Sequence, residues 1–124
     1  MNLRVLPDEL AVCRFDPGHR FDVDLLSVTF YSLTKTEEEL SVVLPESQVP
    51  DGCRTEFGWR ALKVDGVLDF SLTGILASLA NPLAEAGISI FAISTFDTDY
   101  ILVKSDRMEA ALQTLIDAGH YLRG

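Results

Sequence analysis

The sequence predicts an α+β domain with ferredoxin-like βαββαβ topology. Two observations support this: the order of apolar runs after Trp59, and the helical spacing of two leucine-rich segments between those runs. From Trp59 onward the pattern is strand, helix, strand, strand, helix, strand. This order is typical of an antiparallel sheet with two helices on one face.

A strand followed by a helix opens the second half of the chain. Residues 59–64 alternate around a short apolar run, which ends at the Asp65-Gly66 turn. The next segment has helical spacing, and Ser71 or Thr73 can cap its first backbone N–H groups. Pro82 lies inside this helix, so we expect a kink or an early end and restart there. The apolar positions of the helix are Ile75, Leu76, Leu79 and Leu83.

A hairpin and a second helix follow. Residues 88–94 (ISIFAIS) are apolar on both faces, which predicts a strand in the middle of a sheet. A short turn leads to a strand over 100–103, so the two strands should pair as an antiparallel hairpin. A helix is then expected from Ser105 to Gly119, and 120–122 is long enough for a short edge strand. The apolar stripe of this helix consists of Met108, Ala111, Leu112, Leu115 and Ile116.

The first half has a similar but less regular pattern. We therefore predict two tandem units of the same kind, a reduced one over residues 1–57 and a complete one over 58–124. In the reduced unit the helices are expected to be shortened or lost. The elements expected there are strands at 10–15, 27–33 and 40–44 and a short helical turn at 22–26.

Composition excludes several classes of protein. Ten basic against nineteen acidic residues give a net charge of −9, which disfavours unaided binding to nucleic acid or to an anionic membrane. Cys13 and Cys53 stand forty positions apart without a CxxC motif, which indicates neither a metal site nor a disulfide framework and suits a reducing compartment. There is no run typical of a signal peptide or of a membrane span, so we expect a cytoplasmic protein.

The sequence offers little for catalysis. It contains no GxSxG, P-loop or GxGxxG motif, and no spacing typical of metal ligands, so we expect no cofactor and no enzyme activity. Asp97 and Asp99, two residues apart, would share a face of a strand and could form an acid–base pair; a small enzyme using them stays open as an alternative. His19 and His120 are expected to face solvent.

One long string resembles the ACT domain, a small-molecule-binding unit attached to many amino-acid-regulated enzymes. The string is FSLTGILASLANPLAEAGISIFAISTFDTDYILVK, and the resemblance depends on its SLTGI, AGISIFAIS and STFDTDYILV segments. It is similar to short stand-alone bacterial ACT proteins, predicted regulators of amino acid metabolism, and to the ACT repeats of the CASTOR family of arginine sensors. The resemblance implies an allosteric regulator that binds a free amino acid where two ACT units meet, often as a homodimer.

Two segments are the candidate ligand site. The segment 72–75 begins a helix, whose unpaired N–H groups and dipole can hold a carboxylate, and Gly74 permits close approach of a ligand. Asp99 starts a strand expected to be well buried, where a carboxylate needs a partner; the resemblance implies that this partner is the side chain of the ligand. The predicted ligand-binding residues are Asp69, Ser71, Leu72, Thr73, Gly74, Ile75 and Asp99.

Each of these features also has a structural explanation. Ser71 and Thr73 can cap a helix without any ligand, and aspartates in a hairpin can bond to nearby backbone N–H groups. A structural or oligomerisation ACT module that binds no ligand therefore remains the alternative.

Overall fold

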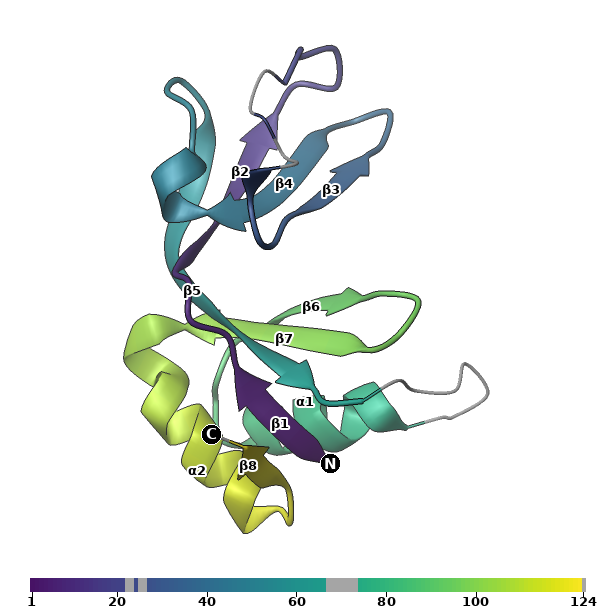
Figure 1. Ribbon diagram of the computed structural model, residues 1–124, viewed down its shortest axis with the longest axis vertical. Coiled ribbons are helices and arrows are strands. Elements are labelled where there is room, and N and C mark those ends of the chain that lie inside the picture. The colour runs from purple at the N-terminus through teal and green to yellow at the C-terminus, as the bar shows by residue number, and fades with distance from the viewer. Residues whose placement is uncertain (22–23, 25–26, 67–73, 124) are drawn as a thin grey trace. The chain divides into compact units, whose positions relative to one another are not determined.

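The computed structural model describes residues 1–21, 24, 27–66 and 74–123. The chain forms two compact units, each described here by itself (Figure 1). Met1–Pro7 and Arg60–Gly124 form the first, which we call the C-terminal unit, and Asp8–Trp59 form the N-terminal unit. Strand β5 (Arg54–Val64) contributes its first part to the N-terminal unit and its second part to the C-terminal unit.

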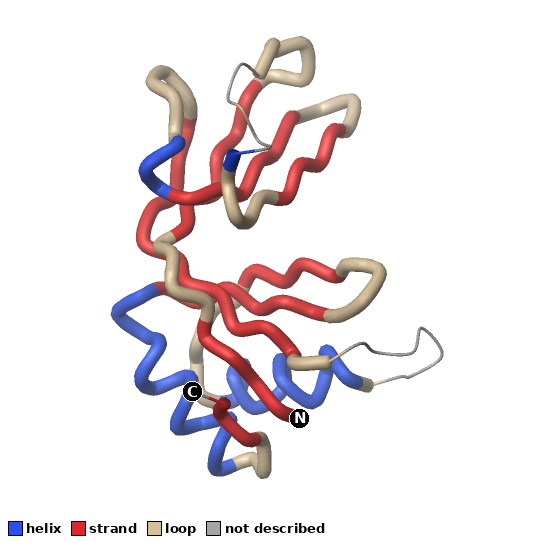
Figure 2. Tube along the Cα trace, viewed as in Figure 1, coloured by secondary structure: helices blue, strands red, loops and turns tan. Residues whose placement is uncertain are grey.

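The C-terminal unit has the predicted topology. From β5 onward the order is strand, helix, strand, strand, helix, strand (Figure 2), which confirms the ferredoxin-like α+β prediction. Its strands follow one another across the sheet in the order β8-β1-β5-β7-β6. The elements are β1 (Asn2–Val5), β5, α1 (Ile75–Glu85), β6 (Phe91–Ser94), β7 (Asp99–Lys104), a 3₁₀ turn (Ser105–Arg107), α2 (Met108–Asp117) and β8 (Tyr121–Arg123).

Strand β1 is an addition that the sequence pattern did not predict. It runs antiparallel to β5 and parallel to β8, so it lies between the first and last strands of the βαββαβ order. Our linear division assigned residues 1–7 to the first half, whereas they are part of the C-terminal unit. A four-residue strand whose partners lie about sixty and more residues away leaves little local signal, because pairing across such a distance depends on the tertiary fold.

The expectation of a central strand over 88–94 was wrong. Strand β6 begins only at Phe91, and β7 is the partner that the structure gives it; its residues alternate between half-buried and exposed. The apolar character of the segment comes partly from Ile88 and Ile90, which precede the strand and pack into the core. The apolar run 88–94 thus consists of two parts, a connecting segment that packs into the core and the strand β6 that follows it.

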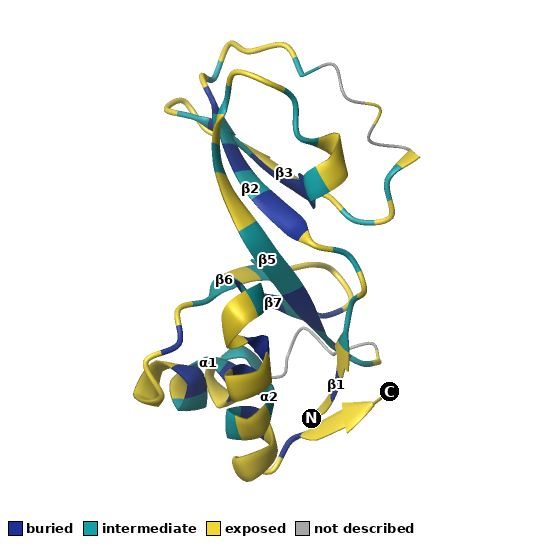
Figure 3. Ribbon diagram, turned by 90° about the vertical axis from the view of Figure 1, so that its left-hand side faces the viewer, coloured by how far each residue is buried: buried dark blue, intermediate teal, exposed yellow. Residues whose placement is uncertain are grey.

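Both helices pack on one face of this sheet. Leu79 and Leu83 of α1 and the buried residues of α2 belong to one core with side chains of β1, β5 and β7. Figure 3 shows buried stretches of both helices and of β5 in dark blue. Ile116, which we placed on the apolar stripe, is instead exposed. Each fully buried leucine or isoleucine stabilises the unit by roughly 1.5–3 kcal/mol. The core consists of Leu3, Leu62, Val64, Leu79, Leu83, Ile88, Ile101, Val103, Met108, Ala111 and Leu115.

His120 is buried, with 8% of its surface exposed, and does not face solvent as expected. Helix α1 runs from Ile75 to Glu85 through Pro82, so the predicted early end and restart does not occur. Proline has no N–H to donate to the carbonyl four residues earlier, which here belongs to Ser78. His120 Nε2 lies 3.0 Å from that carbonyl oxygen, and His120 Nδ1 lies 3.0 Å from the Met1 amino group. His120 therefore satisfies the acceptor that Pro82 leaves without its helical donor.

The N-terminal unit is a small antiparallel sheet in the order β3-β4-β2-β5. Strand β2 (Leu10–Phe15) has the predicted bounds, and β4 (Leu40–Pro45) is one residue longer than predicted. The described part of this unit contains no α-helix, only 3₁₀ structure such as Glu46–Gln48 after β4. Its core consists of Ala11, Cys13, Phe15, Leu40, Val42 and Leu44.

Strand β3 (Ser32–Lys35) starts five residues later than predicted. The N–H of Ser27 donates to the carbonyl oxygen of Asp24 in a turn, and Thr29 Oγ1 donates to Asp8 Oδ2. Serine and threonine bonds of this kind compete with strand pairing, which explains the late start. Most of the helical turn expected at 22–26 lies outside the described residues.

No helix in the described ranges is long and apolar enough to cross a membrane. In the same ranges, no group of three or more His, Cys, Asp and Glu side chains is arranged to hold a metal ion.

The two cysteines, forty positions apart in sequence, meet at one threonine. Thr55 Oγ1 lies 3.2 Å from Cys53 Sγ and donates to Cys13 Sγ at 3.7 Å. Both cysteines are free thiols. Burial raises the pKa of Cys13 from 9.0 to about 11, although the hydrogen bond from Thr55 opposes the shift.

This shift predicts a loss of stability in alkali. The folded thiol stays protonated up to a pH of about 11, while the thiol of the unfolded chain ionises near 9.0. The contribution of the Cys13 thiol to the free energy of unfolding is therefore fully present below pH 9.0. It declines as the pH rises toward about 11, by up to about 2–3 kcal/mol. Urea unfolding across this range should show a steeper decline for the natural chain than for Cys13→Ala. Equal slopes for the two proteins would contradict the assignment.

Candidate ligand site at the start of α1 and β7

Three of the seven predicted ligand residues lie within the described structure: Gly74, Ile75 and Asp99. The other four lie outside the described residues, and these are Asp69, Ser71, Leu72 and Thr73.

Gly74 immediately precedes α1. It has φ +77°, in the left-handed region that glycine adopts without steric cost, and it is exposed. Its carbonyl oxygen accepts the N–H of Ser78 at 2.9 Å, which starts the helical bonding pattern. Glycine has no side chain that could cap the helix, and among the described residues no other side chain caps it. The first N–H groups of an α-helix point out along its axis at the N-terminal end. Such a helix start can hold a carboxylate through its N–H groups and dipole.

Asp99 is the first residue of β7 and pairs in register with Ser94 at the end of β6. Ser94 Oγ donates to Asp99 Oδ1 at 2.6 Å. Strand β7 is buried over residues 101–103 as expected, but Asp99 at its start is only half-buried. Because an ionised carboxylate can accept about four hydrogen bonds, the bond from Ser94 leaves capacity for a cationic donor.

The hairpin turn before Asp99 is anchored to β5. The N–H of Thr95 donates to the carbonyl oxygen of Thr98 at 2.9 Å, and Thr98 Oγ1 donates to the carbonyl oxygen of Val64 at 2.7 Å. Thr98 is one of two buried polar residues among those described, and it holds the start of β7 beside the end of β5. Nothing in the sequence distinguishes Thr98, because threonine is also an ordinary turn residue and only its buried partner sets it apart.

Asp99 lies on the same face of the sheet as α1. Ile101 and Val103, two and four residues further along β7, belong to the core that the helices cover. Asp97 is instead exposed in the turn and outside β7. Strand alternation therefore does not place Asp97 beside Asp99, and the geometric basis for an acid–base pair is missing.

Comparison with known proteins identifies the family to which this fold belongs. The model of the ACT domain family matches residues 54–117. The human protein named cytosolic arginine sensor for mTORC1 subunit 1 is 33% identical in an alignment of 98 positions, which covers 72% of this chain and 30% of that protein. The chain thus corresponds to about a third of the length of the curated relative it matches.

Solved structures extend the comparison. Protein Atu0741 from Agobacterium tumefaciens has a TM-score of 0.91 and 34% identity, covering 98% of this chain and 91% of that one. The regulatory subunit of aspartate kinase from Thermus thermophilus has a TM-score of 0.63 at 12% identity, covering 90% and 93% of the two chains, which indicates the same fold. Because the family model matches more than half of its residues, the chain belongs to the ACT domain family.

Proposed function

We propose that this protein is a regulatory module of amino acid metabolism that senses a free amino acid and has no catalytic activity of its own. The main support in the structure is the carboxylate of Asp99, half-buried at the start of β7 and oriented by Ser94. The relative named as an arginine sensor supports the same class of ligand. A regulatory role also fits the likeness in fold to a regulatory subunit of aspartate kinase.

In the proposed binding mode the two ends of the ligand have separate partners. The carboxylate of the amino acid binds the backbone N–H groups at the start of α1, at Gly74 and Ile75. The other predicted ligand residues precede the helix in the sequence, and these are Asp69, Ser71, Leu72 and Thr73. The cationic side chain of the ligand binds Asp99. The proposed ligand is therefore a basic amino acid.

The proposal includes the assembly that the family resemblance implies. The ligand lies where two ACT units meet, the N-terminal unit is a reduced ACT-like unit, and the protein works in the cytoplasm as a homodimer. Strand β8 supports the dimer, because it lies at the end of the sheet order and its Tyr121 is 69% exposed. Apolar side chains on an edge strand favour pairing with another chain.

One observation supports the alternative of a structural module without ligand. The hydrogen bond from Ser94 gives the carboxylate of Asp99 a partner within the protein, so a ligand is not required to satisfy it. In that case the ACT unit would serve assembly alone.

A thermal-shift titration with free amino acids tests the proposal. At a hundred times its dissociation constant a ligand stabilises the folded protein by about 2.7 kcal/mol. We expect arginine or lysine to raise the melting temperature, and citrulline, which has the shape of arginine without its charge, to have little effect. A melting temperature that no amino acid changes would favour the structural module, and equal effects of arginine and citrulline would contradict the role of Asp99.

A further inference from the structure

Three basic residues form a row across three adjacent strands of the C-terminal unit. In the strand register Arg4 of β1 is opposite Lys63 of β5 on one side and opposite Arg123 of β8 on the other. These are three of the ten basic residues of a chain with a net charge of −9. Like charges directly opposite one another destabilise a sheet, so the row needs a compensating anion.

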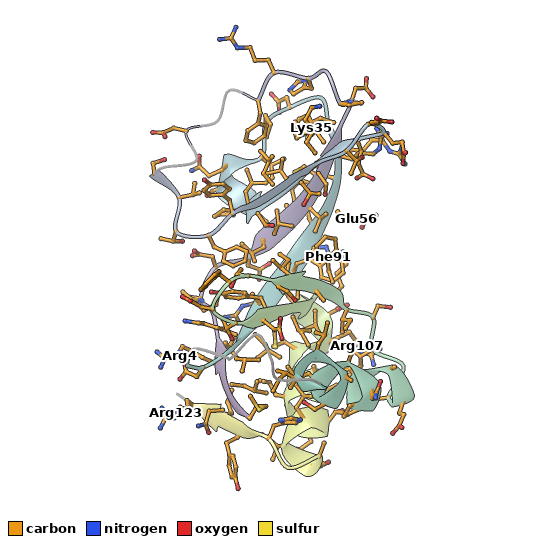
Figure 4. All side chains as sticks on the ribbon, turned by 90° about the vertical axis from the view of Figure 1, so that its right-hand side faces the viewer. Arg4, Lys35, Glu56, Phe91, Arg107 and Arg123 are labelled. Atoms are coloured by element: carbon orange, nitrogen blue, oxygen red, sulfur yellow. The ribbon has the colours of Figure 1, made fainter. Side chains whose placement is uncertain are left out.

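The row lies on the face of the sheet away from the helices. Leu3, Leu62 and Val64 alternate with these residues along β1 and β5, and all three belong to the core that α1 and α2 cover. The side chains of Arg4 and Arg123 are 50% and 61% exposed. Figure 4 labels both, and they extend from the ribbon on the same side of the molecule.

One carboxylate already brings the two guanidinium groups together. Asp65 Oδ2 lies 3.1 Å from Arg4 Nη2 and 3.8 Å from Arg123 Nη1. The hydrogen bond from Arg4 lowers the pKa of Asp65. Burial acts in the opposite direction, and the charges of Arg4, Arg123 and Lys63 lower the pKa further. Asp65 is 15% exposed, so it holds the guanidinium groups from the protein side and leaves their outer edges toward solvent.

The charges in this group do not balance. Among the described residues, three cations face one carboxylate, which leaves a net charge of +2 in a row that spans roughly 10 Å from the first strand to the third. We propose that Lys63, Arg4 and Arg123 bind a small oxyanion with two negative charges, such as a phosphoryl group or a dicarboxylate. Two guanidinium groups that converge on one oxygen present forked N–H donors to such an anion.

The geometry favours a small anion over a polyanion. The guanidinium groups converge on a point instead of following a groove, and the acidic remainder of the chain repels an extended polyanion. The inference does not rest on the proposed amino acid site, because Asp99 lies on the helix-covered face and the row on the opposite one.

Titration of the full chain with inorganic phosphate and, separately, with malonate at low ionic strength tests the proposal. Backbone amide shifts in NMR spectra should change saturably with one site per chain, and the largest changes should lie around Arg4, Lys63 and Arg123. Arg4→Gln and Arg123→Gln should each weaken the affinity by about tenfold or more, because each removes a charged hydrogen-bond donor. Lys63→Gln, which breaks no ion pair of Asp65 shown in the structure, should weaken it without disturbing the fold.

Arg14→Gln is the matched control. Arg14 is a half-exposed arginine of the N-terminal unit that lies 3.5 Å from an acidic residue, Asp16, and its loss should leave the affinity unchanged. Saturable binding of both anions, or of phosphate alone, that the row variants weaken would support the site and define its ligand. The proposal is overturned by the absence of saturable binding, by equal loss in Arg14→Gln, by unchanged affinity in the row variants, or by binding of an acidic peptide but of neither small anion.

Discussion

Replacing His120 with alanine is expected to lower the free energy of unfolding by about 2–4 kcal/mol. The substitution leaves the carbonyl oxygen of Ser78 without the donor that lies 3.0 Å from it, and that carbonyl has no helical donor because residue 82 is proline. It also opens a cavity where a buried ring was. Urea unfolding of the two proteins measures the difference. His19→Ala is the control: His19 is exposed and stacks on Phe15, and its loss should cost less than about 1 kcal/mol.

The role of Pro82 in this arrangement can be isolated by a double-mutant cycle. In Pro82→Ala the backbone regains an N–H that can donate to Ser78 in the ordinary helical way. His120→Ala should therefore cost about 1 kcal/mol less in the Pro82→Ala background than in the natural chain, about the net worth of one hydrogen bond. Strictly additive effects would mean that His120 stabilises the unit by packing and not by replacing the missing helical donor.

Asp99→Asn is expected to weaken the binding of a basic amino acid by about 1.5–3 kcal/mol, or roughly 10- to 150-fold. The substitution keeps the shape of the side chain and an oxygen that can accept the hydrogen bond from Ser94, but it removes the charge that attracts a cationic group. The stability of the protein without ligand should change little, because Asp99 is only half-buried. Calorimetric titration and melting curves of the same variant separate the two effects.

Asp97→Asn serves as the control for this experiment, because Asp97 is exposed in the same hairpin and lies outside β7. It should leave both affinity and stability unchanged. A protein with Asp99→Asn that melts early yet binds arginine normally would show that the carboxylate only supports the hairpin. Equal losses of affinity in the two variants would point to a long-range effect of net charge.

Local patterns in the sequence were sufficient for the order of strands and helices from β5 onward and for strands β2 and β4 of the N-terminal unit. The residues of β2 were predicted without error, and the helical spacing of Leu79 and Leu83 identified the buried face of α1. The short turn predicted the pairing of β6 with β7. Each of these features depends either on the spacing of apolar residues within one segment or on the length of one turn. The spacing and the turn length are both visible in neighbouring residues of the sequence.

Features that join distant parts of the chain were decided only by the tertiary structure. Met1 and His120 are 119 residues apart, Arg4 and Asp65 are 61 apart, and Thr55 contacts Cys13 42 residues before it. From the sequence alone His120 was expected in solvent, the two cysteines were expected to be isolated, and β1 was not predicted. A periodic pattern indicates whether a residue is buried, but it does not specify the register or the partner of a strand. Those depend on which distant segments the folded chain brings together, because pairing energy comes from contacts across strands and not from the strand itself.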